Sequence, residues 1–450
     1  MRRARKHGQV LAGLTLPLAA GTDPAAVVVA SRRKTEPYFL LEQPDRDGSA
    51  LAALGCVHAI SDRGPDRAAR VSAAWRALAA GAQADPSDGP AGAGLIAVGG
   101  FAFADTGGDA PQWDGFDPAS LHVPEVAIAR AGADTRLTIA VCAGADDTAD
   151  DLLARAERRL AELVERPLPM LDPEPAVRPK VTSLAPPEHF EEAIARAVER
   201  IRRGEFEKII LAREVAVRAG TDHDAAAVFD VLRGNFGSCF VFCVARDDAA
   251  FVAASPELLI RREGSRAQTV ALAGSIRRSA DPAVDDHLGE QLRVSTKDRE
   301  EHAIVARRIQ RTLSRRAVWV AAPDEPSVIK VANIQHLATP IRAQLREPMS
   351  ALELVALMHP TPAVGGEPRA AAVPRISALE GFDRGWYAGA VGWTDSNDDG
   401  EFCVALRCAL LRGRDARCFS GVGVVRDSDP AAELAETEIK LGALLPVLAL

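Results

Sequence analysis

The stretch 204-GEFEKIILAREV-215 places a lysine in an apolar row. Successive side chains of a β-strand alternate between its two faces, so Lys208 shares a face with Phe206 and Ile210. An unpaired ammonium group in such a position costs several kcal/mol or loses its proton. The stretch therefore predicts a buried strand in which the lysine needs either a partner or a function.

The composition is that of an ordinary globular protein. The 450 residues are 47% hydrophobic and 26% charged, which is enough for a large core in two or three domains or in one elaborate domain. A net charge of −8 argues against a general nucleic-acid-binding protein. Seven scattered cysteines without a CxxC pair predict neither a disulfide framework nor a zinc site, which favours a reducing cytoplasm.

The N-terminus has one feature of an exported protein. Four basic residues within positions 2–6 precede 9-QVLAGLTLPLAA-20, an order of charge and apolar run that is typical of a signal peptide. The strand-like segments 26-AVVVAS-31 and 38-YFLLEQP-44 follow at once, so we expect a cytoplasmic protein. No run approaches the roughly eighteen apolar residues of a membrane span, and we expect no membrane contact.

The chain divides at a proline-rich stretch, 167-PLPMLDPEPAVRP-179, which predicts an exposed connector between residues 1–180 and residues 188–450. An amphipathic helix is predicted directly after it, over 188–205. Before it, the sequence predicts strands at 26–30, 94–103, 123–129 and 136–142, and helices near 66–81 and 147–165.

Polar residues lie inside apolar strands in the second half. In 239-CFVFCVARDDAAFVAASPELLIRR-262, two strands are joined by Asp247 and Asp248, and Glu257 follows the second strand. One interpretation is a strand end with its carboxylate in water. The other is an acid whose pKa is raised by its surroundings, so that it can donate a proton near neutrality.

Two further segments leave alternatives open. The stretch 270-VALAGSIRR-278 predicts an apolar strand followed by a turn at Gly274 and Ser275, whose backbone N–H groups could either receive an anion or simply form a tight turn. The stretch 293-RVSTKDREEHAIVARRIQRTL-313 predicts one long helix. Its acidic and basic residues, Glu301 among them, either form a surface salt-bridge ladder or supply oxygen ligands to Mg²⁺.

The C-terminal region again places charge among apolar residues. Arg407 lies within 402-FCVALRCALL-411, which predicts a strand in which the guanidinium pairs with a carboxylate of the protein or of a ligand. In the next predicted strand, 418-CFSGVGVVRDSDP-430, Gly421 and Gly423 allow the backbone to approach a ligand closely.

The last predicted helix, 431-AAELAETEIKLGALL-445, carries Glu433, Glu436 and Lys440 on one face. Together with the buried cations and acids described above, this helix predicts a pocket for a small anionic substrate. The residues alone do not name that substrate.

Ten segments in a fixed order carry a family resemblance: FEKIILAR, SPELL, ALAGS, STKDREEH, QHLATP, HPTPAVGG, GFDRGWYAGAVGW, ALRCALL, GVGVV and ETEIK. This set, which spans residues 188–445, resembles the chorismate-utilising enzymes, specifically the isochorismate synthases of menaquinone and catecholate siderophore pathways. In the first 180 residues, only 94-GLIAVGGFAF-103 fits the family's variable N-terminal half. The resemblance implies one α/β domain of two large, facing, mostly antiparallel sheets with helices outside, as in anthranilate synthase component I.

The resemblance also implies roles for individual residues. Lys208 matches the general base that activates water to attack C2 of chorismate, and Glu257 matches the acid that protonates the departing C4 hydroxyl. Glu301 and Glu436 would hold Mg²⁺, with Glu433 nearby through water. The remaining matches are implied to bind or line the substrate: Arg407, Lys440, Gly421 and Gly423 on the enolpyruvyl carboxylate side, and Gly274, Ser275, His336, Ala363 and Tyr387 elsewhere.

The choice of subfamily rests on few residues. Relatives that insert ammonia lack the base lysine, so Lys208 favours water as the nucleophile. Salicylate synthases keep this lysine and then eliminate pyruvate, but the segment 359-HPTPAVGG-366 with Ala363 favours stopping at isochorismate, whereas Tyr387 fits either group. A non-catalytic homologue is expected to have lost one of the acid, base or metal-binding residues, and none is lost. A monomer is expected, because one chain supplies the whole predicted site.

Overall fold

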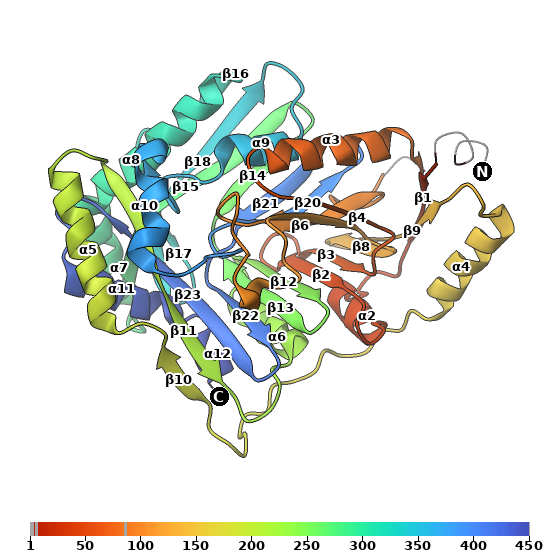
Figure 1. The fold of residues 1–450 in the computed structure, drawn as a ribbon, viewed down its shortest axis with the longest axis horizontal. Helices are drawn as coiled ribbons and strands as arrows, with labels where there is room; N and C mark the ends of the chain where they lie inside the picture. The colour runs from red at the N-terminus through yellow and green to blue at the C-terminus, as the bar shows by residue number, and fades with distance from the viewer. Residues whose placement is uncertain (1–3, 5–7, 85–87, 450) are drawn as a thin grey trace.

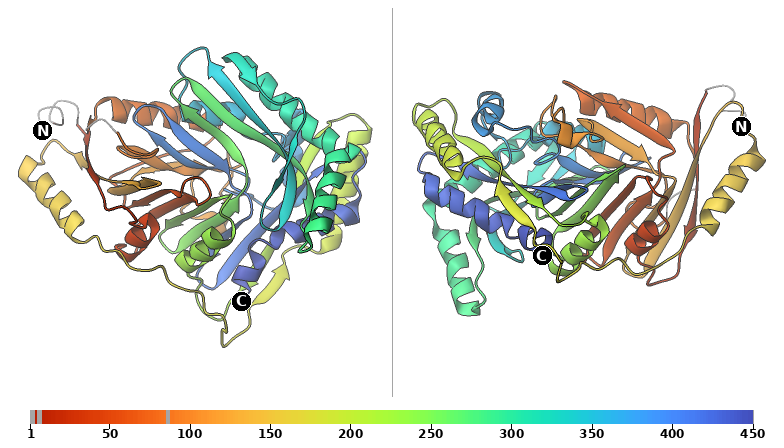
Figure 2. Two further views of the ribbon diagram at one scale, coloured as in Figure 1. Left: turned by 180° about the vertical axis from the view of Figure 1, so that it is seen from behind. Right: turned by 60° about the horizontal axis from the view of Figure 1, so that its bottom comes forward.

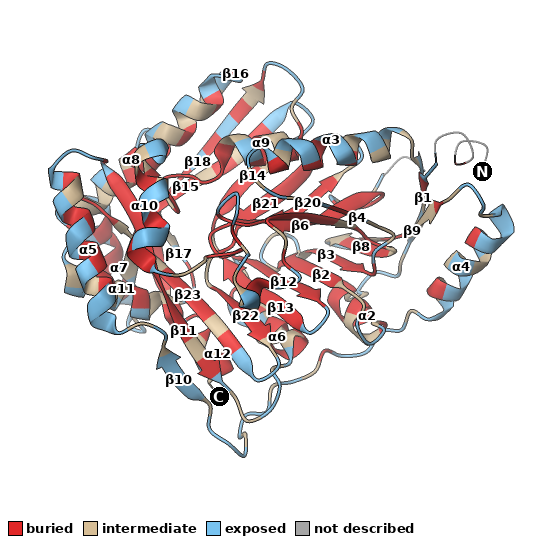
Figure 3. Cartoon of the chain, in the orientation of Figure 1, coloured by how far each residue is buried: buried red, intermediate tan, exposed pale blue. Residues whose placement is uncertain are grey.

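Two β-sheets organise the computed structural model, which describes residues 4, 8–84 and 88–449 (Figure 1). Every pair of neighbouring strands in these described ranges is antiparallel except β1 and β5. Most of the strands are buried, apart from short edge strands such as β10, and the helices lie outside them with their outer faces exposed (Figure 3). The predicted fold class, two large antiparallel sheets with outer helices, is confirmed.

The larger sheet has 13 strands within the described residues. In spatial order they are β10 (Lys180–Ser183), β11 (Lys208–Arg218), β23 (Asp415–Val424), β22 (Cys408–Arg412), β13 (Ala249–Ser255), β12 (Phe240–Arg246), β2 (Tyr38–Gln43), β3 (Ser49–Leu54), β8 (Val126–Ala131), β9 (Asp134–Ala143), β1 (Val10–Pro17) and β5 (Gln83–Ala84), with β19 (Gly366–Glu367) beside β11.

The smaller sheet has 10 strands in the same described ranges. Its spatial order is β16 (Ala317–Ala321), β18 (Ile334–Leu345), β15 (Arg266–Arg277), β14 (Leu258–Glu263), β21 (Gly400–Val404), β20 (Ala390–Asp395), β6 (Ile96–Phe101), β7 (Ala119–Val123) and β4 (His58–Asp62), with β17 (Ser327–Lys330) beside β18.

The helices cover the outer faces and the ends of the two sheets, as the views in Figure 2 show. They are α2 (Pro24–Ala30), α3 (Arg67–Ala80), α4 (Ala149–Ala161), α5 (Pro187–Arg202), α6 (Ala225–Asn235), α7 (Pro282–Val294), α8 (Thr296–Ser314), α9 (Ala351–Met358), α10 (Arg369–Glu380), α11 (Pro430–Leu441) and α12 (Leu445–Leu448), with a 3₁₀ turn at Pro111–Trp113. Within the described residues, no helix is both long and apolar enough to pass through a lipid bilayer.

Strands from both halves of the sequence share each sheet. In the larger sheet β12 pairs with β2, and in the smaller sheet β20 pairs with β6. The proline-rich stretch lies in a segment without helix or strand, between α4 and β10, as predicted for a connector. The predicted helix over 188–205 is present as α5, and its apolar side chains Phe190, Ile194 and Val198 are buried.

At three of the places where the chain changes sheets, the sequence shows one continuous apolar run. It passes from β7 to β8 through 124–125, from β13 to β14 through 256–257, and from β21 to β22 through 405–407. The prediction of one strand over 123–129 is therefore wrong, and so is that of one strand over 402–411. Both sheets bury these residues, so hydrophobicity does not mark the crossing.

Three other predicted elements also differ from the structure. The run predicted as a strand at 26–30 is part of helix α2, because Asp23 accepts hydrogen bonds from the N–H groups of Ala25 and Ala26 and Pro24 occupies the first turn. Residues 293–313 do not form one helix, because Ser295 separates α7 from α8 and caps the latter.

The predicted turn at Gly274 and Ser275 is a β-bulge inside β15. The register of β15 against β18 shifts between Ala273 and Ser275, and Gly274 has φ +76°. Glycine adopts this left-handed conformation without a steric penalty, so the strand continues through the bulge instead of ending.

Candidate active site

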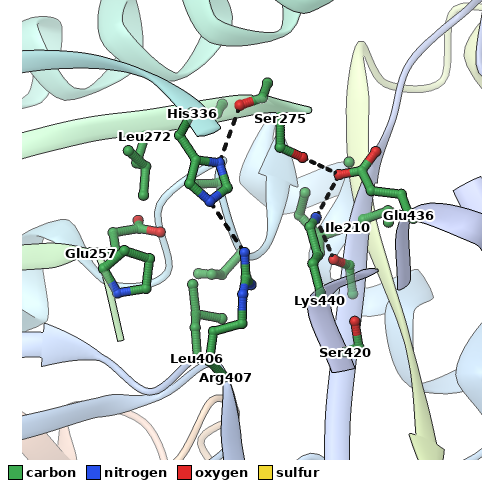
Figure 4. Close-up of a pocket in the computed structure, with 18 of the residues that line it drawn as sticks. Ile210, Glu257, Leu272, Ser275, His336, Leu406, Arg407, Ser420, Glu436 and Lys440 are labelled. Carbon is green, nitrogen blue, oxygen red and sulfur yellow. Dashed lines mark hydrogen bonds and ion pairs between the residues drawn. The ribbon is translucent and has the colours of Figure 1, made fainter. Parts of the chain in front are cut away.

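A polar pocket lies where the chain crosses between the sheets, beside β11, β15 and β23 (Figure 4). Its walls contain every sequence-predicted site residue except Lys208 and Glu433. Those in the wall are Glu257, Gly274, Ser275, Glu301, His336, Ala363, Tyr387, Arg407, Gly421, Gly423, Glu436 and Lys440. Segments that are as far apart in the sequence as Glu257 and Lys440 are thus brought together.

Lys208 is the first residue of β11 and is 1% exposed. Its Nζ lies 2.9 Å from Glu301 Oε1, so this pocket-lining carboxylate from α8 supplies the partner that a buried ammonium group requires. Gly423 on the neighbouring strand β23 leaves space for the pair, since a Cβ there would lie 2.1 Å from Glu301 Oε1 and 2.9 Å from Lys208 Cε.

Glu257 lies in the crossing from β13 to β14 and is 3% exposed. The alternative of a carboxylate in water is therefore wrong. Burial raises the pKa of Glu257 to about 8, although the positive charges of Lys208 and Arg407 oppose the shift. At neutral pH the side chain is consequently a neutral acid with a proton to donate.

His336 and Arg407 form the next part of the wall, at the centre of Figure 4. An Arg407 Nη donates to His336 Nε2 at 3.2 Å, so the histidine proton is on Nδ1, which faces the Gly274 carbonyl oxygen at 3.2 Å. Burial is the main cause that lowers the pKa of His336 to about 3, and the positive charge of Arg407 is the second cause. The ring is therefore neutral. The guanidinium has no carboxylate partner among the described residues, which leaves it available to an anionic ligand.

The prediction that Arg407 lies in a strand is wrong. Arg407 occupies the crossing between β21 and β22 with φ +49°. This position aims the guanidinium at the space between the sheets, and burial lowers the pKa of Arg407.

Glu436 and Lys440 on α11 lie on the side of the pocket opposite Glu257 in Figure 4. Lys440 Nζ is 2.7 Å from Glu436 Oε1 and donates to the Gly421 carbonyl oxygen at 2.9 Å, while Ser275 Oγ donates to Glu436 at 2.6 Å. Burial alone would raise the pKa of Glu436, but Lys440 and Ser275 outweigh it and lower the pKa to about 2. Glu436 is therefore ionised.

The three carboxylates predicted to bind Mg²⁺ are each engaged by a different lysine. Glu301 pairs with Lys208, Glu436 with Lys440, and Glu433 with Lys297 at 2.6 Å. Across residues 4, 8–84 and 88–449, no three His, Cys, Asp or Glu side chains are arranged to hold a metal ion. The surface ladder predicted within 293–313 does not form, since Glu301 pairs with Lys208 of β11 and Lys297 pairs with Glu433 of α11. The metal role stays a prediction, and the oxygen donors are of the type that Mg²⁺ prefers.

Aromatic packing forms a further wall that was not predicted. Tyr387 is stacked on Phe419, with ring centroids 5.1 Å apart and an interplanar angle of 14°, and both line the pocket. Phe419 precedes Gly421 and Gly423 at the period of two that marks one strand face, so the alternation in β23 could have identified it. Ile210 could likewise have been found two residues after Lys208.

The comparisons with known proteins agree with this geometry. Residues 1–449 match the family described as chorismate binding enzyme. The salicylate biosynthesis isochorismate synthase of Pseudomonas aeruginosa is 36% identical over 425 residues, which are 94% of this chain and 87% of that protein. Isochorismate synthase MenF of Bacillus subtilis is 34% identical over 355 residues, or 79% of this chain and 75% of the relative.

A solved structure shows the same fold along the whole chain. MenF, the menaquinone-specific isochorismate synthase from Escherichia coli, aligns with a TM-score of 0.81 at 26% identity and covers 99% of this chain and 97% of its own. The match to the family covers nearly every residue, and the relatives are aligned over most of their own length. The chain therefore belongs to the chorismate-binding enzymes.

Proposed function

We propose that this chain is an isochorismate synthase, an isomerase that interconverts chorismate and isochorismate. The names of the relatives support the reaction, and the pocket supports the chemistry. The observation that carries the proposal is the buried Glu257, neutral at pH 7, in a pocket that also has Lys208 behind its wall and cations for an anionic substrate.

The proposed reaction needs one base and one acid. Lys208 accepts a proton from water as the water oxygen bonds to C2 of chorismate. The ring double bonds shift, the C4–O bond breaks, and Glu257 donates its proton to the departing hydroxyl, which leaves as water. One water enters and one leaves, so the reaction is an isomerisation. Positioned acids and bases each contribute roughly 10²–10⁴-fold in rate.

The cations on the pocket wall suit a substrate with two carboxylates. Arg407 lacks a carboxylate partner among the described residues, so it can receive a carboxylate of the substrate. Lys440 is paired with Glu436 and held on Gly421, and it supplies a second positive charge at the pocket wall. Neutral His336 holds the Arg407 guanidinium by accepting its hydrogen bond. We propose that Gly274, Ser275, Ala363 and Tyr387 complete the wall around the ring.

Glu301 and Glu436, with Glu433 through water, would hold Mg²⁺. When bound, the ion supplies positive charge that fixes and polarises a substrate carboxylate. We further expect a cytoplasmic monomer that serves a menaquinone or a siderophore pathway.

The test is incubation of the purified protein with chorismate and Mg²⁺, with and without EDTA, followed by chromatography of the products. Isochorismate that disappears with EDTA supports the proposal. Salicylate together with pyruvate would instead indicate the alternative, a salicylate synthase. Unchanged chorismate with folded protein would indicate a non-catalytic homologue.

A further inference from the structure

A buried ion pair lies at one edge of the strand that carries Lys208. Glu380 ends helix α10 and Arg384 follows it in the next loop, and they are 7% and 4% exposed. The Arg384 Nε donates to Glu380 Oε2 at 2.9 Å. Neither side chain lines the pocket, so the pair has no direct access to a substrate there.

The pair occupies a gap in the larger sheet. One edge of β11 is paired with β23 over 209–218. Within the described part of the chain, the other edge has strand partners only at 208–209 in β19 and at 215–218 in β10. In the gap, Arg384 donates to the Ile210 carbonyl oxygen at 3.0 Å, and Glu380 accepts from the Ala212 N–H at 2.7 Å. Side chains thus take the place of a missing strand, and buried backbone groups require such partners.

The same guanidinium contacts two other parts of the pocket wall. It donates to the Val364 carbonyl oxygen at 2.9 Å, and its Cζ lies 5.5 Å from the centre of the Tyr387 ring. Ile210, Val364 and Tyr387 all line the pocket. Three separate segments of the wall therefore meet on Arg384.

We infer that Glu380 and Arg384 are positioning residues, which fix the segment of β11 with Lys208 against the Val364 loop and the Tyr387 ring. Neither residue touches the substrate. The expected effect on kcat rests on the proposed function. The local order of β11 can be measured without any turnover.

Arg384→Lys is the direct test, because lysine keeps the charge beside Glu380 but has a single nitrogen in place of the three with which the guanidinium reaches Glu380 and the Val364 and Ile210 carbonyl oxygens. Displacing the base strand by about 1 Å is expected to lower kcat about 10–100-fold. KM is expected to change less than about threefold, since Arg407 and Lys440 are not held by the pair.

Arg159→Lys is the matched control. Arg159 on α4 is 1% exposed and is paired with Glu36 at 2.7 Å and Glu125 at 3.1 Å, away from the pocket. A purely structural role predicts that both variants lose kcat in proportion to their loss of stability. The positioning role predicts a loss of kcat in Arg384→Lys alone.

Amide hydrogen exchange of peptides that cover 208–214 gives the second readout. Exchange in Arg384→Lys is expected to be at least about tenfold faster there than in wild type, and unchanged there in Arg159→Lys. Unchanged exchange in Arg384→Lys would overturn the inference even if the enzyme makes isochorismate, and faster exchange would support it even if the proposed function fails. Should Arg384→Lys not fold, Glu380→Gln serves the same test, because its amide oxygen can still accept from Ala212.

Discussion

Replacing Glu257 by glutamine is expected to make the protein more stable and much less active. Glutamine keeps the shape of a protonated glutamic acid but cannot donate the proton, so kcat should fall roughly 10²–10⁴-fold. The stability gain arises because the folded protein keeps Glu257 protonated at a pKa of about 8, whereas the unfolded chain ionises near 4.5.

The sign and size of this gain follow from proton linkage. Between pH 4.5 and 8 the folded state binds a proton that the unfolded state releases, so wild-type stability falls as the pH rises through this window. At about 1.4 kcal/mol per pKa unit, the loss is about 1 kcal/mol at pH 5.5 and about 3 kcal/mol at pH 7. It approaches about 5 kcal/mol above pH 8. Glu257→Gln removes this loss.

Urea unfolding of wild type and variant at several pH values measures the effect. Groups that titrate alike in both proteins cancel in the difference, which should grow by about 2 kcal/mol from pH 5.5 to pH 7. Glu157→Gln is the control, because Glu157 is exposed on α4 and its replacement should give a difference that does not vary in this way. A flat difference for Glu257→Gln from pH 5 to 8 would falsify the assignment of a protonated acid.

Steady-state kinetics with chorismate tests four further expectations. Lys208→Ala should lower kcat by about 10²–10⁴-fold and leave KM within about threefold. A variant with a raised KM and an unchanged kcat would contradict the role of Lys208 as the base. Arg407→Gln should raise KM about 10–100-fold through loss of a charge-assisted hydrogen bond, so an unchanged KM would remove it from substrate binding. Gly423→Ala should lower kcat, because its Cβ would displace Glu301 from Lys208, and wild-type activity would show that the contact is dispensable. For the wild type, kcat/KM should fall as the pH rises through about 8, where Glu257 loses its proton, and a profile flat to pH 9 would exclude this acid.

Much of the fold could be predicted from local patterns. The apolar residues around Lys208 predicted a buried strand, and β11 is buried on both faces. The apolar spacing in 188–205 predicted helix α5, because it records which face of the helix is buried. Local patterns failed at 123–129 and at 402–411, where the chain leaves one sheet and enters the other. Hydrophobicity is continuous through such a crossing, since both sheets bury their residues, so sequence periodicity carries no sign of it.

These crossings also explain why the pocket lies between the sheets. Glu257 and Arg407 both occupy crossings, where the backbone is not committed to a strand ladder and a side chain can point into the space between the layers. The sequence showed a charged residue among apolar neighbours at each of these two positions. It did not predict the direction of Arg407, because that direction depends on φ +49°, a conformation that only the folded crossing requires.

The partners of the buried charges were the least predictable feature, for a physical reason. Glu436 and Lys440 are one helical turn apart, so their pairing follows from the sequence. Lys208 pairs with Glu301 and Lys297 with Glu433, and these residues meet only after β11, α8 and α11 have packed together. A local pattern can therefore show that a charge is buried, but the neighbour that makes its burial tolerable is set by tertiary packing. In this pocket the packed neighbours raise the pKa of one carboxyl and lower that of another, and this contrast is what supports an acid at Glu257 and an ionised ligand at Glu436.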